Sequence, residues 1–139
     1  MAERLLLFRY KDDVLALPAH LTREVIELGQ VAPLPGGRGG LAGLVVTAGQ
    51  AAPLLDLHLL AGLPRHPHAS LGLVVRIGND TLVFPMDEMA GNLTSDEPLT
   101  TPDMISAPQE TGDYRLNFEI RVINPAVLSS TLQARLMPV

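Results

Sequence analysis

The apolar and polar positions at the start of the chain predict a β-hairpin. Residues 5–10 form a compact apolar run, the Lys-Asp-Asp sequence that follows has the composition of a turn, and residues 14–17 resume the apolar pattern. Pro18 ends the second strand, because proline cannot donate a hydrogen bond within a central sheet. Over residues 19–28 the apolar spacing predicts a short helical turn that runs into a strand.

The same pattern returns 67 positions later without a gap. Residues 7–18 align with residues 74–85, and a second alignment, at an offset of 68, joins residues 54–60 to residues 122–128. We interpret the chain as a duplicated β unit, and we expect a binding groove in the seam between the two copies. The identical pairs of the first alignment are Arg9 and Arg76, Asp13 and Asp80, Leu15 and Leu82, and Pro18 and Pro85.

Two further strands and a helical turn are predicted between the copies of the hairpin. The strands, at residues 41–46 and 51–55, are joined by a tight turn in which Gly49 supplies the positive φ that the turn requires. Asp56 follows as a helix N-cap, and Gly62 ends the helical turn.

The remaining segments complete a single domain. Residues 33–40 and 94–113 are rich in residues that interrupt regular structure, and they are predicted to be irregular. Alternating apolar positions predict a last strand at residues 114–123, and Asn124-Pro125 predicts a helix start. The expected organisation of residues 1–139 is a first β lobe at 1–65, a linker at 66–70, a second β lobe at 71–123, and a C-terminal helix at 124–137 with Leu128, Leu132 and Leu136 on one face.

Composition narrows the class of protein. Hydrophobic residues make up 47% of the chain and charged residues 18%, which is typical of a globular protein. The net charge of -5 gives no electrostatic footprint for nucleic acid or anionic lipid. There is no cysteine, and no apolar run is long enough for membrane insertion. We expect a soluble, cytoplasmic protein that binds no nucleic acid.

Residues 43–57, with the sequence GLVVTAGQAAPLLDL, resemble the signature of CheW-type chemotaxis coupling proteins, which runs roughly G-v-i-N-l-R-G-x-v-i-P-v-x-D-L. The glycines, the proline, the Asp and the Leu fall in register. Leu17-Pro18, Glu24-Val25-Ile26 and the Pro-rich loop are similar to the opening order of that family, and residues 82–89 correspond to its later G-l-x-V-D-x-V segment.

This resemblance implies a mainly β fold of two SH3-like five-stranded barrels with pseudo-twofold symmetry, short helical turns and a C-terminal helix. It also implies an adaptor without catalysis or cofactor, which links the regulatory domain of a CheA-type histidine kinase to the cytoplasmic tip of a chemoreceptor. The family's Asn and Arg correspond here to Val46 and Ala48. Alanine cannot replace a charged, fork-shaped donor, so a partner contact that depends on the Arg is absent or remade.

Exposed apolar side chains are the expected means of binding, because an adaptor works through desolvated anchors. For each candidate, burial in the core is the competing interpretation, with about even weight. The candidate partner-binding residues are Val25, Ile26, Leu34, Leu44, Val46, Ala48 and Gln50 in the first lobe, and Phe84 and Met86 in the second.

No catalytic or metal-ligating constellation is predicted. His66 and His68 form a pair in a Pro-rich loop without a nearby Cys or carboxylate, which falls short of a closed metal site. Asp87 and Glu88 are adjacent, and on a strand they would point to opposite faces. Two other classes of function remain open: a small-ligand sensor with an apolar pocket between the lobes, and a self-associating structural β domain.

Overall fold

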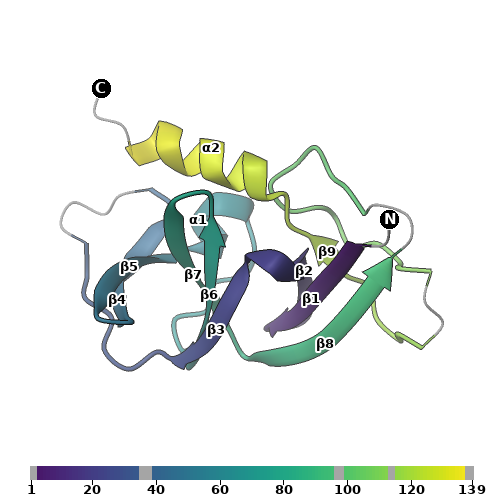
Figure 1. Cartoon of the computed structure of the whole chain (residues 1–139), viewed down its shortest axis with the longest axis horizontal. Helices are drawn as coiled ribbons and strands as arrows, with labels where there is room; N and C mark the ends of the chain where they lie inside the picture. Colours follow the sequence, from purple (N-terminus) through teal and green to yellow (C-terminus); the bar gives the residue numbers. More distant parts are fainter. Residues whose placement is uncertain (1–2, 35–38, 96–98, 113–114, 137–139) are drawn as a thin grey trace.

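The computed structural model describes residues 3–34, 39–95, 99–112 and 115–136, which form two β-sheets with a long C-terminal helix laid across them (Figure 1). The elements are β1 (Glu3–Tyr10), β2 (Asp13–Pro18), the 3-10 helix η1 (Ala19–Leu21), β3 (Thr22–Glu27), β4 (Leu41–Thr47), β5 (Gln50–Leu55), α1 (Leu57–Ala61), β6 (Leu71–Ile77), β7 (Asp80–Met86), β8 (Glu88–Ser95), β9 (Arg121–Val122) and α2 (Pro125–Leu136). Sheet A has the strand order β8-β1-β2-β9, and sheet B has the order β3-β6-β7-β5-β4. Residues 35–38 of the predicted loop lie outside the described residues.

Both copies of the repeated hairpin are confirmed, with the same register. Tyr10 lies opposite Asp13 in the β1–β2 pair, and Ile77 lies opposite Asp80 in the β6–β7 pair. The two turns also match, because Lys11 and Gly78, which are 67 positions apart, have φ values of 53° and 62°. Glycine adopts this left-handed conformation freely, whereas a residue with a Cβ is strained there by about 1–2 kcal/mol.

Burial on both faces explains the continuous apolar runs of the hairpin strands. One face of each hairpin contributes to a core shared by the two sheets, and the other face contributes to a separate core of its own sheet. Phe8 of β1 and Phe84 of β7 meet edge to face in the shared core, with their ring centroids 5.8 Å apart. Leu128 and Leu132 of α2 are buried there too, as the apolar face of the predicted helix requires. The side chain of Leu136 lies outside the described residues.

Each hairpin is flanked by two strands from the other half of the chain. In sheet A, β1 pairs with β8 and β2 pairs in parallel with β9. In sheet B, β6 pairs with β3 and β7 pairs in parallel with β5. The expected lobes at 1–65 and 71–123 therefore do not coincide with the sheets. The reason is that β3 follows β2 along the chain but, after η1, adds to the other hairpin, and β8 likewise follows β7 but adds to β1.

The described residues do not confirm the two five-stranded barrels expected from the resemblance. Sheet A has four strands, and neither sheet closes into a barrel within the described residues. The predicted last strand is also much shorter than residues 114–123, because only Arg121 and Val122 pair with β2, while Ile120 makes an isolated bridge with Gln109. The alternating side chains Leu116 and Phe118 pack at the margin of the core of sheet A without joining its ladder.

The predicted helix ends are confirmed. The Asp56 carboxylate accepts a hydrogen bond from the Leu59 N–H at 3.0 Å, and Gly62 ends α1 in the left-handed conformation. The Asn124 side chain accepts hydrogen bonds from the first turn of α2, and Pro125 is its first residue. No helix in the described part of the chain is both long and apolar enough to cross a membrane.

Candidate functional site

The β4–β5 hairpin carries the most exposed apolar side chain among the predicted binding residues. Ala48 and Gly49 form its turn with φ values of 50° and 76°, the pair of positive angles that a type I′ turn requires. The turn expected at residues 47–50 is thus confirmed. Val46, just before it, is 73% exposed, and Ala48 and Gln50 are also exposed.

The β4 strand is an edge of sheet B, and the sheet curls so that its two edges approach each other. The Thr47 hydroxyl donates a hydrogen bond to the Glu24 carboxylate at 2.8 Å, which joins β4 to the opposite edge strand β3. Inside the curl lies the separate core of sheet B. Further along β4, Leu44 exchanges two backbone hydrogen bonds with Ala32, at 2.8 and 2.9 Å. Among the described residues, no strand pairs with the outer side of β4 beyond this bridge.

Val25 on β3 and Val46 on β4 lie one residue away from the Glu24–Thr47 hydrogen bond. Since successive side chains on a strand alternate, both valines face away from the interior of the curl. Val25 is 43% exposed, so the structure places apolar surface on both of these edge strands.

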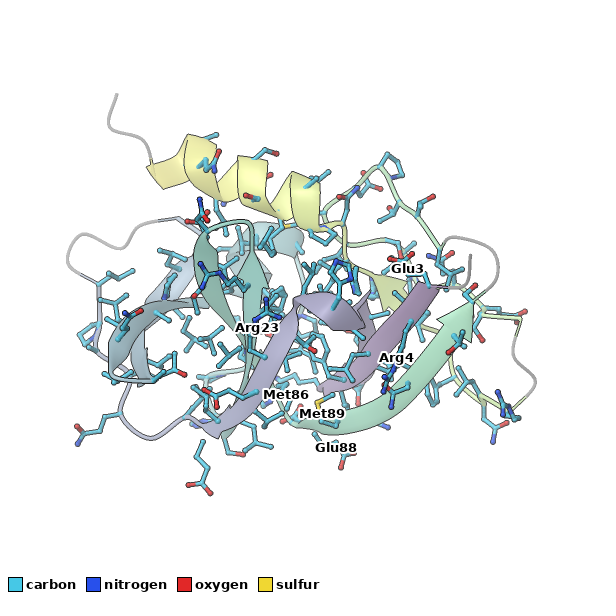
Figure 2. All side chains as sticks on the ribbon, viewed as in Figure 1. Glu3, Arg4, Arg23, Met86, Glu88 and Met89 are labelled. Carbon is cyan, nitrogen blue, oxygen red and sulfur yellow. The ribbon has the colours of Figure 1, made fainter. Side chains whose placement is uncertain are left out.

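A shallow cavity of about 270 Å³ opens at this end of the curl. Ala48 and Gln50 line it together with two arginines that the sequence did not single out, Arg23 of β3 and Arg76 of β6. Figure 2 shows Arg23 on β3. Arg76 aligns with Arg9 in the repeat, but that identity indicated only a shared hairpin and gave no indication of a cavity. The site therefore combines the exposed valines of the edge strands β3 and β4 with two arginines that line the neighbouring cavity.

The remaining candidates divide into half-buried and fully buried side chains. Ile26, Leu34 and Leu44 are half-buried, and Ile26 packs against the core of sheet B. Phe84 and Met86 have no exposed surface, which contradicts their prediction as partner-binding residues. Both belong to the shared core, because the seam between the two sheets is filled by packed side chains instead of forming an open groove.

The surface beside that seam carries an exposed large apolar side chain from the second half of the chain. Met89, at the start of β8, is 37% exposed, whereas Met86, at the end of β7, is buried. Figure 2 shows the two methionines close together where β7 passes into β8. Next to them, Glu88 accepts a hydrogen bond from Arg9 of β1 at 3.1 Å.

The linker between the halves is held by a small polar cluster. The Tyr10 hydroxyl donates to the Pro64 carbonyl at 2.5 Å, and His66 Nε2 lies 2.6 Å from Asp87 Oδ1. Burial alone would raise the pKa of Asp87, but the hydrogen bonds from His66 and from the Lys11 N–H, together with the positive charges of these residues, hold it below its ordinary value. This arrangement makes His66 part of a structural contact.

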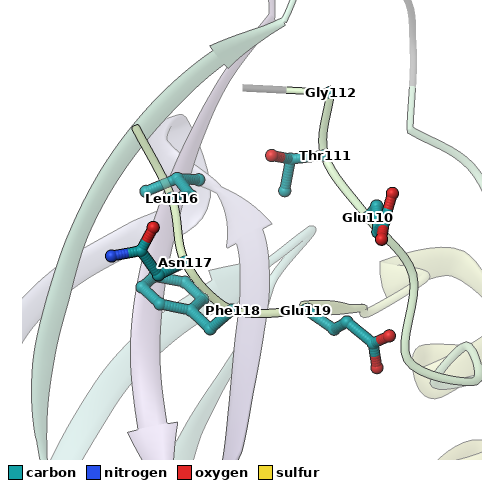
Figure 3. Close-up of a pocket in the computed structure, with 7 residues that line it drawn as sticks. All are labelled: Glu110, Thr111, Gly112, Leu116, Asn117, Phe118 and Glu119. Carbon is teal, nitrogen blue, oxygen red and sulfur yellow. The ribbon is translucent and has the colours of Figure 1, made fainter. Parts of the chain in front are cut away.

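Two larger cavities lie outside the predicted binding residues. One, of about 550 Å³, lies beside the linker and is lined by Tyr10, Arg65 and His66 together with apolar side chains. The other, of about 520 Å³, is formed by the irregular segment before β9. Figure 3 shows Glu110 and Thr111 on one arm of this segment and Leu116 and Phe118 on the other. No sequence motif pointed to either cavity.

Comparison with known proteins places the chain in a family. A search of curated proteins gives no match to the sequence. The crystal structure of the scaffolding protein TtCheW from Thermoanaerobacter tengcongensis has a similar fold, with a TM-score of 0.68 and 16% sequence identity, over 89% of this chain and 85% of that chain. The model of the CheW-like domain family matches residues 4–116. That match covers most of the sequence, including both hairpins and the β4–β5 edge, and the chain therefore belongs to the CheW-like domain family.

Proposed function

We propose that this protein is a chemosensory coupling adaptor, which acts in the cytoplasm and links a CheA-type histidine kinase to chemoreceptors by binding both. Membership of the CheW-like domain family and the likeness to a scaffolding protein support this proposal. The observation that carries it is the exposure of Val46, 73%, on an edge strand within the matched region. The exposed backbone groups of an edge strand are a template for pairing with another strand, and such a partner would bury Val46.

The kinase regulatory domain is the proposed partner of the β4–β5 edge. Beyond the bridge between Leu44 and Ala32, the outer side of β4 offers backbone groups to another sheet edge, and Val46 offers an apolar anchor beside them. Val46 and Ala48 stand where the family has Asn and Arg, so the contact proposed here depends more on apolar burial than on charge. Arg23 and Arg76 at the neighbouring cavity supply the basic groups that the turn itself lacks.

Isothermal titration against the regulatory domain of a kinase from the same chemosensory array tests this contact. Replacing Val46 with Asp places a charge in the interface, and we expect the affinity to fall by at least about tenfold, since burying an unpaired charge costs more than about 1.4 kcal/mol. Leu59→Asp is the matched control, because Leu59 is 48% exposed on α1 and lies outside the proposed contact. Unchanged affinity of the Val46 variant would contradict the proposal.

The receptor tip is the proposed partner of the surface between β3 and β8. The seam between the sheets is filled, so this second contact has to use exposed side chains at its margin, and Val25 and Met89 are the large apolar ones on these two edge strands. Figure 1 shows β3 and β8 both at the front of the lower part of the molecule in this view. A helical hairpin tip fits such a surface through apolar anchors.

Co-sedimentation with receptor signalling fragments tests this second contact separately. Met89→Asp is expected to reduce receptor binding and to leave kinase binding unchanged, and Val46→Asp is expected to do the reverse. Val25→Asp is expected to reduce receptor binding, and because Val25 adjoins the Glu24–Thr47 hydrogen bond, it is not used to separate the two contacts. If Met89→Asp and Val46→Asp each lose both partners while keeping the wild-type circular dichroism spectrum, the two contacts are not separate. Co-purified small molecule in native mass spectrometry would instead favour a ligand sensor.

The proposed adaptor also has a pseudo-twofold relation between its halves. Support comes from the equal registers of the two hairpins and from the helix caps Asp56 and Asn124, which lie 68 positions apart and are each followed by a helix. Two related but unequal surfaces suit a protein that must hold two different partners at once.

A further inference from the structure

The two halves of the chain, on either side of residues 63–70, are interleaved in both sheets. Strands β1, β2, β3 and β5 of the first half pair with β8, β9, β6 and β7 of the second half, respectively. Among the described residues, residues 63–70 are the covalent connection between these halves. Neither half builds a sheet alone, and each buries its apolar faces against the other.

The sequence repeat shows that this interleaving is an exchange between two equivalent units. In sheet B, Leu54 of β5 lies opposite Val83 of β7, and in sheet A, Val122 of β9 lies opposite Ala16 of β2. Val122 aligns with Leu54 at the offset of 68, and Val83 aligns with Ala16 at the offset of 67. Each unit therefore contributes a strand that pairs with the hairpin of the other unit: β5 of the first pairs with β7, and β9 of the second pairs with β2. The two pairs have the same register relative to the sequence repeat.

We propose that two copies of this chain exchange halves about residues 63–70, to give a dimer in which every pairing between the halves is made between chains. The partner surface needed for this exchange already exists, because it is the surface that each half presents to the other within one chain. Such an exchange is a low-cost route to a dimer when a hinge segment can extend.

Residues 63–70 have the properties of a hinge. They contain no helix or strand, and Pro64 and Pro67 favour extended backbone around them. Eight extended residues span up to about 29 Å, enough to carry one half away from the other. Leu63, at the start of the segment, is buried in the shared core, and its backbone contacts His58 and Leu57. Beyond Leu63, three polar contacts are described: the Tyr10–Pro64 hydrogen bond, the His66–Asp87 contact and the backbone hydrogen bond from Leu28 to Ser70. The ladders and cores lost on opening are all regained in the dimer, so protein concentration decides between the two forms.

The absence of cysteine from the sequence permits a direct test of this exchange by cross-linking. Arg4 of β1 and Thr94 of β8 lie opposite each other, and both are exposed. Full-length Arg4→Cys and Thr94→Cys chains, carrying tags of different mass, are unfolded together in urea, refolded at high concentration and then oxidised. Opposed strand residues lie within the reach of a disulfide.

The expected result is a disulfide-linked heterodimer of the two variants. Arg4→Cys refolded with Ser129→Cys is the matched control, because Ser129 lies on α2 and does not face β1. We expect about tenfold more heterodimer from the facing pair than from the control, since cysteines out of reach cannot be bridged without backbone movement. Equal yields from the two mixtures would overturn the proposal, whatever the amount of non-specific dimer.

Changing the length of the hinge gives a second measurement. After deletion of residues 65–69, the shortened segment is expected to be too short for the two halves of one chain to pair with each other. Light scattering is then expected to give a mass of twice the 14.9 kDa of the single chain. Inserting a Gly-Ser segment of the same length after Pro67 is the control, and it is expected to lower the yield of heterodimer. A deletion variant with the wild-type circular dichroism spectrum and the mass of a monomer would also overturn the proposal; if that variant fails to fold, the cross-linking result decides.

Discussion

The buried hydroxyl of Tyr10 predicts a loss of stability at alkaline pH. Tyr10 is 2% exposed, and its hydroxyl donates a hydrogen bond to the Pro64 carbonyl. Burial disfavours the phenolate, and the carboxylates of Asp56, Asp87 and Asp13 repel it, so the pKa of Tyr10 is raised to about 12. In the unfolded chain the same group ionises near its ordinary value of about 10.

The sign and the size of the effect follow from this difference. Below about pH 10 the group is neutral in both states and the free energy of unfolding does not depend on it. As the pH rises toward 12, the unfolded chain loses the proton first, so the unfolded state gains stability relative to the folded state. A difference of about two pKa units corresponds to a loss of about 3 kcal/mol once the pH exceeds both values, and of about 2 kcal/mol at about pH 11.5.

Urea unfolding followed by far-ultraviolet circular dichroism measures the effect, because the chain has no tryptophan for fluorescence. The free energy of unfolding is compared at about pH 8 and about pH 11.5. Tyr10→Phe is the control: at neutral pH we expect it to lose about 1 kcal/mol, because the Pro64 carbonyl loses its hydrogen-bond donor, and its alkaline slope should be much smaller. If Tyr10→Phe keeps the full alkaline slope of the wild type, the assignment of the effect to Tyr10 is refuted.

Three further predictions concern caps, a close approach and the core; the free energy of unfolding measures the first and the third, and hydrogen exchange measures the second. Asp56→Ala is expected to cost about 1 kcal/mol through loss of a cap, and Asn124→Ala about 2 kcal/mol, because the Asn124 amide also donates to the Thr101 carbonyl at 2.8 Å. Equal losses would show that this second hydrogen bond contributes nothing. Gly43→Ala is expected to abolish hydrogen-exchange protection at the bridge between β4 and Ala32, because its Cβ would lie 2.6 Å from the Ala32 oxygen; Gly78→Ala, with open space around its Cβ, is the control that keeps the protection. Met86→Ala is expected to cost about 2–5 kcal/mol as a core truncation, and a loss of partner binding without a loss of stability would show that Met86 is not core.

Local elements of this fold are predictable from sequence because their signals lie within a few residues. The hairpins, the turn at Gly49, the caps at Asp56 and Asn124 and the 3-10 turn before β3 each depend on neighbours in the chain, and each is confirmed. The pairing of β3 with β6 and of β8 with β1 depends on contacts between distant segments, and no residue of these strands specifies its partner. The lobes expected at 1–65 and 71–123 therefore do not coincide with the two sheets, although both copies of the repeated hairpin are present.

The candidate site was predictable only in part, for a related reason. A strand that is buried on both faces is a continuous apolar run, so the sequence does not show which of its residues are exposed. Phe84, which is buried, and Val46, which is exposed, therefore could not be told apart. The family resemblance located the β4–β5 hairpin, but the repeat spacing alone could not show that the seam is packed. Arg23 and Arg76 come together only because sheet B curls, which no local pattern indicates.

The edge-to-face contact of Phe8 and Phe84 has a mechanical consequence. It lies in a continuous packed interior that includes both sheets and the helix laid across them, and such interiors resist compression. A displacement applied to one sheet is then carried to the other as a rotation or translation of the whole body. Two partners bound to different sheets would therefore be held at a fixed distance and orientation from each other.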